Sequence, residues 1–412
     1  MSKVKQIKIP WGAWYEDGFL DLSFPVDWEA DLCSINDAPR LDDNTILKSL
    51  QNPFKTPDLF SMAEKGKKAV IAVEDITRPA RLKRILKPVV NGLLKAGINK
   101  QDIMFVICSG AHAPMLKHEM ILKLGRDIVD NYLILNHNPY DNLSETGIIL
   151  GKTPVKVNSH FFKADIKIGI GSIMPHPFAG FSSGGKLILP GLSDIATLER
   201  SHKYVMMGFR GGVNDVETNK FRMEMEDVAL KIGMDYFIGI VPNSRREIGG
   251  VFAGHLIDAH RAGVEFARKI YKTEISGLYD IAILNTYPKD SELMQADAAL
   301  IPLKTSDSQF LKENGAVVIA SRCSNGFGYH SLFGPGMRLA KKPIKRRNLQ
   351  NKDLIVFAPG INQPEFQCLY WEGYKLADKW HDVIALLKNR FPKQPRVLVL
   401  PSAPLQLISC RT

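Results

Sequence analysis

The stretch Lys68-Ala69-Val70-Ile71-Ala72-Val73-Glu74, which runs on into Asp75-Ile76-Thr77-Arg78-Pro79, decides the fold. Its apolar and β-branched residues predict a buried strand, and the polar residues after them predict a loop at the carboxyl end of that strand. A helix is expected next, over residues 81–94, ending near Gly97. A buried strand followed by a loop and a helix is the unit from which parallel α/β sheets are built.

The same alternation continues along the chain. Further short apolar runs predict strands at residues 103–108, 132–135, 164–170, 279–284, 316–320, 354–358 and 397–400. Helical patterns are found at residues 194–207, 220–232, 258–271 and 291–303. We therefore expect two α/β domains with mostly parallel sheets and an active-site cleft between them.

The expected boundary lies near residues 272–273. Residues 1–272 form the N-terminal domain, which carries the histidine and cofactor-binding motifs, and residues 273–412 form a C-terminal domain that contributes substrate contacts. The last residues of the chain are able to pack back on the N-terminal domain.

The composition is that of an ordinary soluble globular protein. The chain has 412 residues, of which 45% are hydrophobic and 24% charged, enough for two domains with proper cores. No run approaches the ~20 apolar residues of a membrane span, and the N-terminus lacks the apolar stretch of a signal peptide. Five cysteines without a CxxC spacing fit reduced thiols better than a disulfide framework. A cytoplasmic protein is expected.

The net charge is +11, with 54 basic and 43 acidic residues. The basic residues are scattered, apart from short clusters such as Lys341-Lys342-Pro343-Ile344-Lys345-Arg346-Arg347, and no nucleic-acid recognition pattern accompanies them. We therefore expect neither a nucleic acid nor a membrane as partner. A basic surface of this kind attracts anionic substrates and cofactors.

One region concentrates residues with chemical function: Pro175-His176-Pro177, then Gly180-Phe181-Ser182-Ser183-Gly184-Gly185-Lys186, then Ser201-His202-Lys203. Glycine allows the backbone to approach a ligand closely, and proline fixes the direction of the chain. The glycine run has the GxxxxGK spacing of a phosphate-binding loop, but Leu187 stands where Ser or Thr would hold magnesium. A nucleotide triphosphatase is therefore not favoured.

Three histidines are candidates for acid/base or metal chemistry. His112 follows a strand within Ser109-Gly110-Ala111-His112, His176 lies between two prolines, and His202 lies on an expected helix. Histidines suit a proton-transfer pair near neutral pH. All three as ligands of one zinc ion would make a zinc-dependent hydrolase, although they lack the close spacing common in such sites. A non-catalytic binding protein for an anionic ligand is the other alternative.

Two further features suggest that an anion binds at this site. Asp75, Thr77 and Arg78 place a carboxylate, a hydroxyl and a guanidinium on one loop. The forked guanidinium of Arg bonds two oxygens of a phosphate or carboxylate. Lys186 lies in a loop that allows close approach of a ligand rather than on a polar helix face.

Taken together, these motifs resemble those of the nickel-dependent lactate racemase (LarA-type) family. The family's Asp-x-Thr-Arg-Pro is similar to residues 75–79, and its Ser-Gly-x-His is similar to residues 109–112. Its Pro-His loop leading to Gly-Gly-Lys is similar to residues 175–186, and its downstream histidine is matched by His202. The order and the spacing agree, and the resemblance covers most of the chain.

The resemblance implies a nickel-pincer nucleotide cofactor, a pyridinium mononucleotide with two thio-acid arms, covalently linked to Lys186. It implies that His202 is the protein ligand of nickel. The residues that it implies for holding the cofactor are Asp75, Ile76, Thr77 and Arg78. Cofactor-biosynthesis proteins are then expected as partners.

The activity implied by the resemblance is that of a racemase or epimerase of a small-molecule 2-hydroxy acid, working by reversible hydride transfer. His112 and His176 would be the acid/base pair, one for each enantiomer. In the substrate segment the chain keeps Gln295 but has Met294 and Ala298 where the lactate enzymes carry a Tyr and a Lys. Loss of that lysine removes a cation that would pair with a small carboxylate, so we expect a substrate other than lactate.

Overall fold

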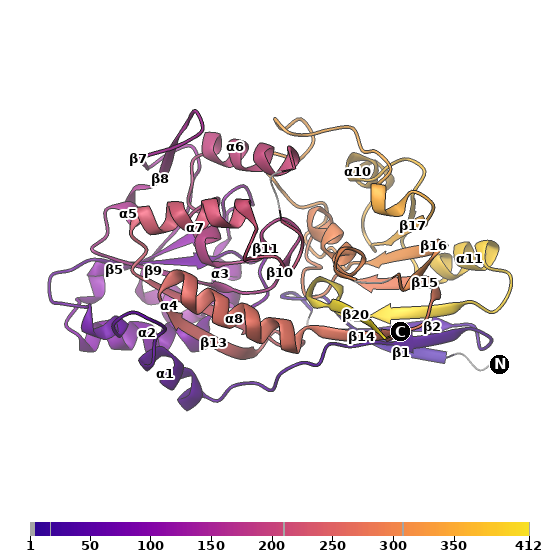
Figure 1. Ribbon diagram of the computed structural model, residues 1–412, viewed down its shortest axis with the longest axis horizontal. Helices are drawn as coiled ribbons and strands as arrows, with labels where there is room; N and C mark the ends of the chain where they lie inside the picture. Colours follow the sequence, from indigo (N-terminus) through magenta and orange to yellow (C-terminus); the bar gives the residue numbers. More distant parts are fainter. Residues whose placement is uncertain (1–4, 17, 209–210, 307–308, 412) are drawn as a thin grey trace. The chain divides into compact units, whose positions relative to one another are not determined.

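The structure is a computed structural model that describes residues 5–16, 18–208, 211–306 and 309–411 (Figure 1). It divides into two compact units. The first, here called the histidine unit, is Ala38–Lys269 and contains the three candidate histidines. The second, here called the split unit, combines Met1–Asp37 with Ile270–Thr412.

The histidine unit is built on a six-stranded sheet. From one edge to the other its strands are β13 (Ile248–Gly254), β12 (Tyr236–Pro242), β9 (Ile166–Ser172), β4 (Ala69–Glu74), β5 (Ile103–Cys108) and β6 (Leu133–Asn136). All neighbouring strands are parallel except β12 and β13. Every residue of β4 and β12 is buried, so the middle of the sheet is covered on both faces, as in other parallel sheets with helices around them (Figure 1).

The helices of this part of the chain are α1 (Asp43–Gln51), α2 (Lys83–Lys95), α3 (Lys117–Leu124), α4 (Arg126–Asn131), α5 (Ser159–Phe162), α6 (Ile195–Met206), α7 (Lys220–Ile232) and α8 (Leu256–Ile270). In α2 the apolar residues recur three and four positions apart, and Ile85, Val89 and Leu93 are fully buried. Gly97, with φ +98°, follows the end of α2. Two hairpins complete the unit: β7 (Leu143–Leu150) with β8 (Thr153–Asn158), and β10 (Pro175–His176) with β11 (Gly180–Phe181).

The split unit has its own six-stranded sheet, and all of its strands are parallel. Their order is β18 (Lys375–Ala377), β17 (Asp353–Phe357), β16 (Leu311–Ala320), β15 (Tyr279–Asn285), β19 (Arg396–Leu400) and β3 (Glu29–Leu32). The smaller pairs are the antiparallel β1 (Lys5–Trp11) and β2 (Gly18–Phe24), and the parallel β14 (Lys272–Ser276) and β20 (Leu407–Arg411). Its helical segments include η4 (Leu293–Leu300), α9 (Pro302–Thr305), α10 (Gln363–Leu369) and α11 (Trp380–Arg390).

The expected fold class, α/β with mostly parallel sheets in two units, is confirmed. The chain passes from one unit to the other after Lys269, close to the expected boundary at residues 272–273. The first 37 residues differ from the expected division, because β3 pairs with β19 and so joins the C-terminal half. The last strand, β20, pairs with β14 of its own unit rather than with the N-terminal half.

One expected helix has a different form. Residues 291–303 form the 3₁₀ segment η4 followed by the short helix α9, instead of one continuous α-helix. Pro302 lacks a backbone N–H and so cannot continue the hydrogen-bond ladder of a preceding helix. In the described ranges no helix has the length and hydropathy needed to cross a membrane. All five cysteines lie in those ranges, and none is bonded to another.

Candidate active site

The carboxyl ends of β4 and β5 place two of the predicted motifs beside each other in the histidine unit. β4 ends at Glu74 and is followed by the Asp75–Arg78 loop, and the neighbouring β5 ends at Cys108 and is followed by the loop that carries His112. Loops at the carboxyl ends of adjacent parallel strands meet at one edge of a sheet, which is where ligands gather in such folds.

Asp75 and His112 form a direct pair at this edge. Asp75 Oδ2 lies 2.7 Å from His112 Nδ1, and Asp75 Oδ1 accepts hydrogen bonds from the N–H and the hydroxyl of Thr77. Burial alone raises the pKa of Asp75, but His112, Arg78 and Thr77 together lower it well below its usual range. An ionised Asp75 accepts the Nδ1–H of His112, so the neutral ring carries its lone pair on Nε2.

Arg78 extends the same group of residues. Its Nη1 donates to the Thr77 hydroxyl at 2.9 Å, and its side chain is half-buried. Ile76 is buried at 8% exposure. The predicted cofactor-holding stretch is therefore continuous in space with the Asp75–His112 pair, and its role in binding a cofactor stays a prediction.

Residues 175–186, here called the glycine loop, bring together His176 and Lys186. The side-chain nitrogen of Lys186 lies 2.8 Å from Nε2 of His176. On the other side of the ring, the N–H groups of Phe178 and Ala179 each donate to His176 Nδ1 at 3.2 Å. Because Nδ1 accepts, the neutral ring carries its proton on Nε2, the opposite tautomer to that of His112.

Several glycines of this loop have no room for a side chain. Gly184 has φ +65°, a backbone conformation that favours glycine, and it lies in the 3₁₀ turn η3 (Gly184–Leu187) that carries Lys186. A Cβ on Gly185 would lie 2.6 Å from the carbonyl oxygen of Met225 on α7. The loop is thus packed directly on helix α7.

Arg222 of α7 fixes the backbone of the glycine loop. Sequence reasoning missed this residue. Its side chain is fully buried and donates to the carbonyl oxygens of Ala179, Phe181 and Ser183. Glu226, 3.8 Å away, compensates its charge. Nothing in the sequence distinguishes this arginine from the other charged residues of an ordinary helix, because its partners are backbone atoms of a distant loop.

His202 lies on α6 and has the properties of a neutral ligand. Its Nδ1 donates to the carbonyl oxygen of Leu198 at 2.7 Å, which leaves the lone pair on Nε2. Burial, with smaller contributions from the nearby charges of Lys186 and His112, lowers the pKa of His202 to about 4. These electrostatic interactions show that the residues implied for nickel, for cofactor attachment and for proton transfer lie in one neighbourhood.

Ser183 adds an unusual polar group to the loop. Its φ is +63° although it is not a glycine, and its hydroxyl is buried without a hydrogen-bond partner among the described residues. Buried polar groups without partners are rare in proteins and each calls for an explanation. The hydroxyl lies against the buried strand β9, because a Cβ on Gly171 would come within 2.5 Å of it.

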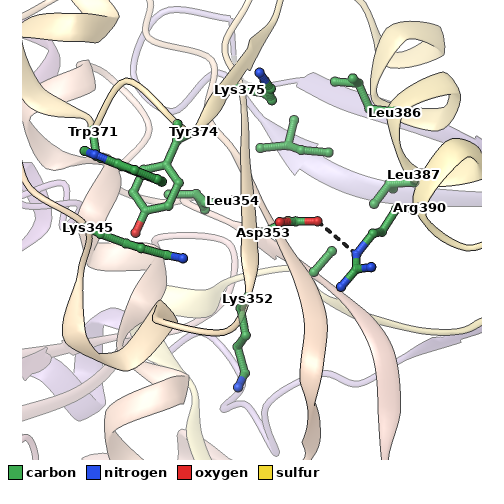
Figure 2. A pocket seen from close by; sticks show the side chains of 13 residues that line it. Lys345, Lys352, Asp353, Leu354, Trp371, Tyr374, Lys375, Leu386, Leu387 and Arg390 are labelled. Atoms are coloured by element: carbon green, nitrogen blue, oxygen red, sulfur yellow. Dashed lines mark ion pairs between the residues drawn. The ribbon is translucent and has the colours of Figure 1, made fainter.

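The predicted substrate residues Met294, Gln295 and Ala298 lie on η4 of the split unit and are all half-buried. Their part in substrate binding stays a prediction. The split unit also has a pocket of about 190 Å³, shown in Figure 2, between Trp371 and Arg390. This pocket lies at the amino ends of β17 and β18 and contains none of the predicted site residues.

Comparisons with known proteins agree with the motifs. Residues 15–212 match the family model described as the lactate racemase N-terminal domain. The chain is 29% identical over 320 residues to the lactate racemase of Thermoanaerobacterium thermosaccharolyticum, covering 76% of this chain and 72% of that protein. It is 28% identical over 299 residues to the lactate racemase of Lactiplantibacillus plantarum, covering 70% of this chain and 69% of that protein.

Two solved structures share the fold. The lactate racemase apoprotein from T. thermosaccharolyticum has a TM-score of 0.78 at 23% identity, covering 98% of this chain and 100% of that chain. A protein from Thermotoga maritima has a TM-score of 0.70 at 17% identity, covering 91% of this chain and 100% of that chain. The match over residues 15–212, the two aligned lactate racemases and the shared fold support the assignment of this chain to the lactate racemase family.

Proposed function

We propose that this protein is a racemase or epimerase of a 2-hydroxy acid and that it uses a nickel-pincer nucleotide covalently attached to Lys186. The observation that carries the proposal is the pair of histidines in opposite tautomers, His112 on Asp75 and His176 on Lys186. One ring presents a lone pair at Nε2 and the other presents an N–H that donates a hydrogen bond. A reaction that inverts a stereocentre needs such a pair.

The setting of Lys186 supports covalent attachment. The Nε2–H of His176 faces the lysine nitrogen, and a nitrogen that accepts this hydrogen bond is a neutral amine rather than an ammonium. That is the form of an amine that reacts with an acyl or thioacyl carbon.

The setting of His202 supports nickel binding. The ring is neutral near pH 7 and its Nε2 lone pair is not used by the Leu198 contact. A nitrogen donor of this kind, combined with the sulfur and carbon donors of the cofactor, suits a square-planar Ni(II) site. Arg78 would hold the phosphate end of the nucleotide, with Asp75, Ile76 and Thr77 in the same loop.

The chemistry requires proton transfer by the chain itself. The α-hydrogen of a 2-hydroxy acid is poorly acidic beside a carboxylate, and the bound cofactor would supply reversible hydride acceptance in place of deprotonation. His112 takes the hydroxyl proton of one enantiomer through Nε2 and is held in position by Asp75. When the other enantiomer forms, His176 gives a proton from Nε2 of its imidazolium form, because the neutral ring would have to become an imidazolate, and the two residues exchange roles in the reverse direction.

We propose a substrate other than lactate. Met294 and Ala298 stand where the family's tyrosine and lysine contact lactate, and the smaller Ala298 leaves room for a larger group. Gln295 remains as a polar contact. A larger or differently anchored 2-hydroxy acid fits these changes.

The zinc hydrolase is less well supported. No cluster of three or more His, Cys, Asp or Glu side chains with metal-binding geometry occurs in the part of the chain that the structure describes. His112 and His176 use their Nδ1 atoms within the protein, and His176 directs Nε2 to a lysine rather than to other ligands. A non-catalytic protein that binds an anion through Lys186 and Arg78 remains the second candidate, and activity tests separate it.

The experiment is intact-protein mass spectrometry with nickel analysis, on protein co-expressed with a pincer-cofactor biosynthesis pathway. Wild type is expected to gain the mass of the cofactor together with nickel, Lys186→Ala to lose both, and the control Lys203→Ala to keep both. An unmodified wild-type chain, when a lactate racemase is loaded in the same host, would contradict the proposal. A panel of single-enantiomer 2-hydroxy acids then tests loss of optical activity.

A further inference from the structure

A fully buried ion pair lies directly behind the candidate site and has no part in the proposed chemistry. Lys123 of α3 is 0% exposed, and its nitrogen donates to Glu74 Oε1 at 2.7 Å and to the backbone carbonyl of Arg78 at 2.6 Å. Glu74 is 4% exposed and is the last residue of β4. The lysine therefore links the end of the strand to the end of the Asp75–Arg78 loop.

The other side of the pair connects to the glycine loop. Glu74 accepts hydrogen bonds from the N–H and the hydroxyl of Ser172, the last residue of β9. The carbonyl of Ser172 accepts the hydroxyl of Ser182, whose oxygen accepts the N–H of Met174 at 3.1 Å. A continuous buried chain of hydrogen bonds thus runs from Arg78 to the residue before Pro175.

Stability alone does not explain such a pair. Taking two charges out of water is costly, and replacing a buried ion pair by apolar residues of similar volume is often neutral or stabilising. Four of the contacts in this chain are made by backbone atoms of Arg78, Ser172 and Met174, which belong to the loops of the site or lead into them. The contacts therefore fix where those loops lie.

We propose that Glu74 and Lys123 are a positioning pair, which holds the loop of Asp75–Arg78 and the loop of His176 in one fixed arrangement. The pair contacts neither substrate nor cofactor and acts through the backbone of the two loops. The proposal rests on the proposed function for its effect on rate. Its effect on the geometry of the two histidines does not depend on that function.

The test uses five variants of the full chain. Glu74→Gln and Lys123→Met each leave one member of the pair alone, and the double variant removes both charges. Ser182→Ala removes the hydroxyl that links Ser172 to Met174 and so interrupts the series of buried hydrogen bonds. Lys231→Met removes a lysine from an exposed ion pair with Asp227 on α7 and is the matched control.

Three readouts are compared: the urea midpoint, the ring signals of His112 and His176 in ¹⁵N-histidine NMR spectra of the protein without cofactor, and kcat on the best 2-hydroxy acid. His112→Gln and His176→Gln assign the signals. Both single variants are expected to lower the urea midpoint, because each leaves a buried charge uncompensated. The double variant is expected to regain most of the midpoint, while both histidine signals stay displaced and kcat stays about 100-fold low, since displaced catalytic groups lose rate steeply.

Ser182→Ala is expected to displace the His176 signal and to leave that of His112 in place. The proposal fails if the double variant regains wild-type histidine signals or wild-type kcat, because the pair is then only structural. It also fails if Lys231→Met gives the same displacements. Where a single variant does not fold, the double variant and Ser182→Ala decide. A wild type without an adduct on Lys186 overturns the proposed function, whereas the histidine signals still decide the role of the pair.

Discussion

Lys186 Nζ lies 2.8 Å from His176 Nε2, while the opposite nitrogen of that ring accepts the backbone N–H groups of Phe178 and Ala179. This arrangement assigns the ring proton to Nε2. His112 shows the reverse pattern, with Nδ1 held by Asp75. His112 and His176 therefore start as opposite neutral tautomers before any substrate binds.

The two histidines are expected to serve proton transfer rather than cofactor attachment. His112→Gln and His176→Gln should keep the cofactor mass on Lys186 but lower the racemisation rate by about 100- to 10,000-fold, the usual contribution of a general acid or base. Lys186→Ala should lose both. Mass spectrometry and polarimetry on the same samples check this, and a loaded His112→Gln with wild-type rate would remove His112 from the mechanism.

Asp75 is expected to set the tautomer of His112. Asp75→Asn replaces an ionised acceptor by an amide, so Nδ1 of His112 loses its fixed proton acceptor and the rate should fall by about 100-fold or more. The matched control is Asp258→Asn, because Asp258 bonds His255 Nδ1 at 2.6 Å outside the candidate site. An equal loss of rate in both variants would show that the effect is not specific to the His112 pair.

The packing of the glycine loop on α7 predicts a strict requirement for glycine at position 185. Gly185→Ala would bring a Cβ to 2.6 Å from the Met225 carbonyl oxygen, so the loop must shift. We expect a loss of about 1–3 kcal/mol in the free energy of unfolding, the usual cost of overpacking. Gly212→Ala, where nothing lies within 4 Å of the new Cβ, is the control and should leave urea unfolding unchanged.

The sequence predicted the parts of the fold that depend on local pattern. Continuous apolar runs such as residues 69–73 are buried on both sides and became central strands of a parallel sheet. The short β3, in contrast, has only one buried residue, and its place beside β19 depends on a pairing with a strand more than three hundred residues away along the chain. No local pattern contains that information.

In the candidate site, too, some residues could be predicted from local sequence pattern and others depend on contacts that only the folded chain makes. Polar residues that follow strands directly, such as Asp75 and His112, could be recognised from their position at strand ends. Arg222, Glu74 and Lys123 could not, because in sequence each is one charged residue among many. Their importance lies in being buried against backbone carbonyls and N–H groups that only the folded chain supplies.

The altered substrate segment is expected to exclude lactate through the missing cation. Ala298→Lys restores an ammonium group on η4 that would pair with a small carboxylate, so kcat/KM for lactate should rise by at least about 10-fold, the size of one charge-assisted hydrogen bond. Activity on the preferred larger substrate should fall, since the new side chain occupies space. Ala299→Lys is no control because Ala299 is buried, so the exposed Lys304→Ala on α9 serves to monitor general effects on this segment.

His137 is expected to make the protein sensitive to acid. Its ring is buried, Nε2 donates to the Ser193 carbonyl at 2.9 Å, and burial lowers the pKa of His137 to about 4 from 6.5. The unfolded chain therefore binds a proton between pH 6.5 and 4 that the folded chain does not bind. Stability rises with pH across this window and is lost as the pH falls through it.

Because of His137, the free energy of unfolding is expected to fall by on the order of 3 kcal/mol when the pH falls from 6.5 to 4. Other buried histidines, including His202 and His260, titrate in the same direction, so the difference between variants is the informative quantity. His137→Gln should flatten the plot of unfolding free energy against pH in this window, whereas the exposed His381→Gln should leave its slope unchanged. A His137→Gln slope equal to that of wild type would contradict the prediction, because it would mean that the native ring takes up a proton as readily as the unfolded chain does.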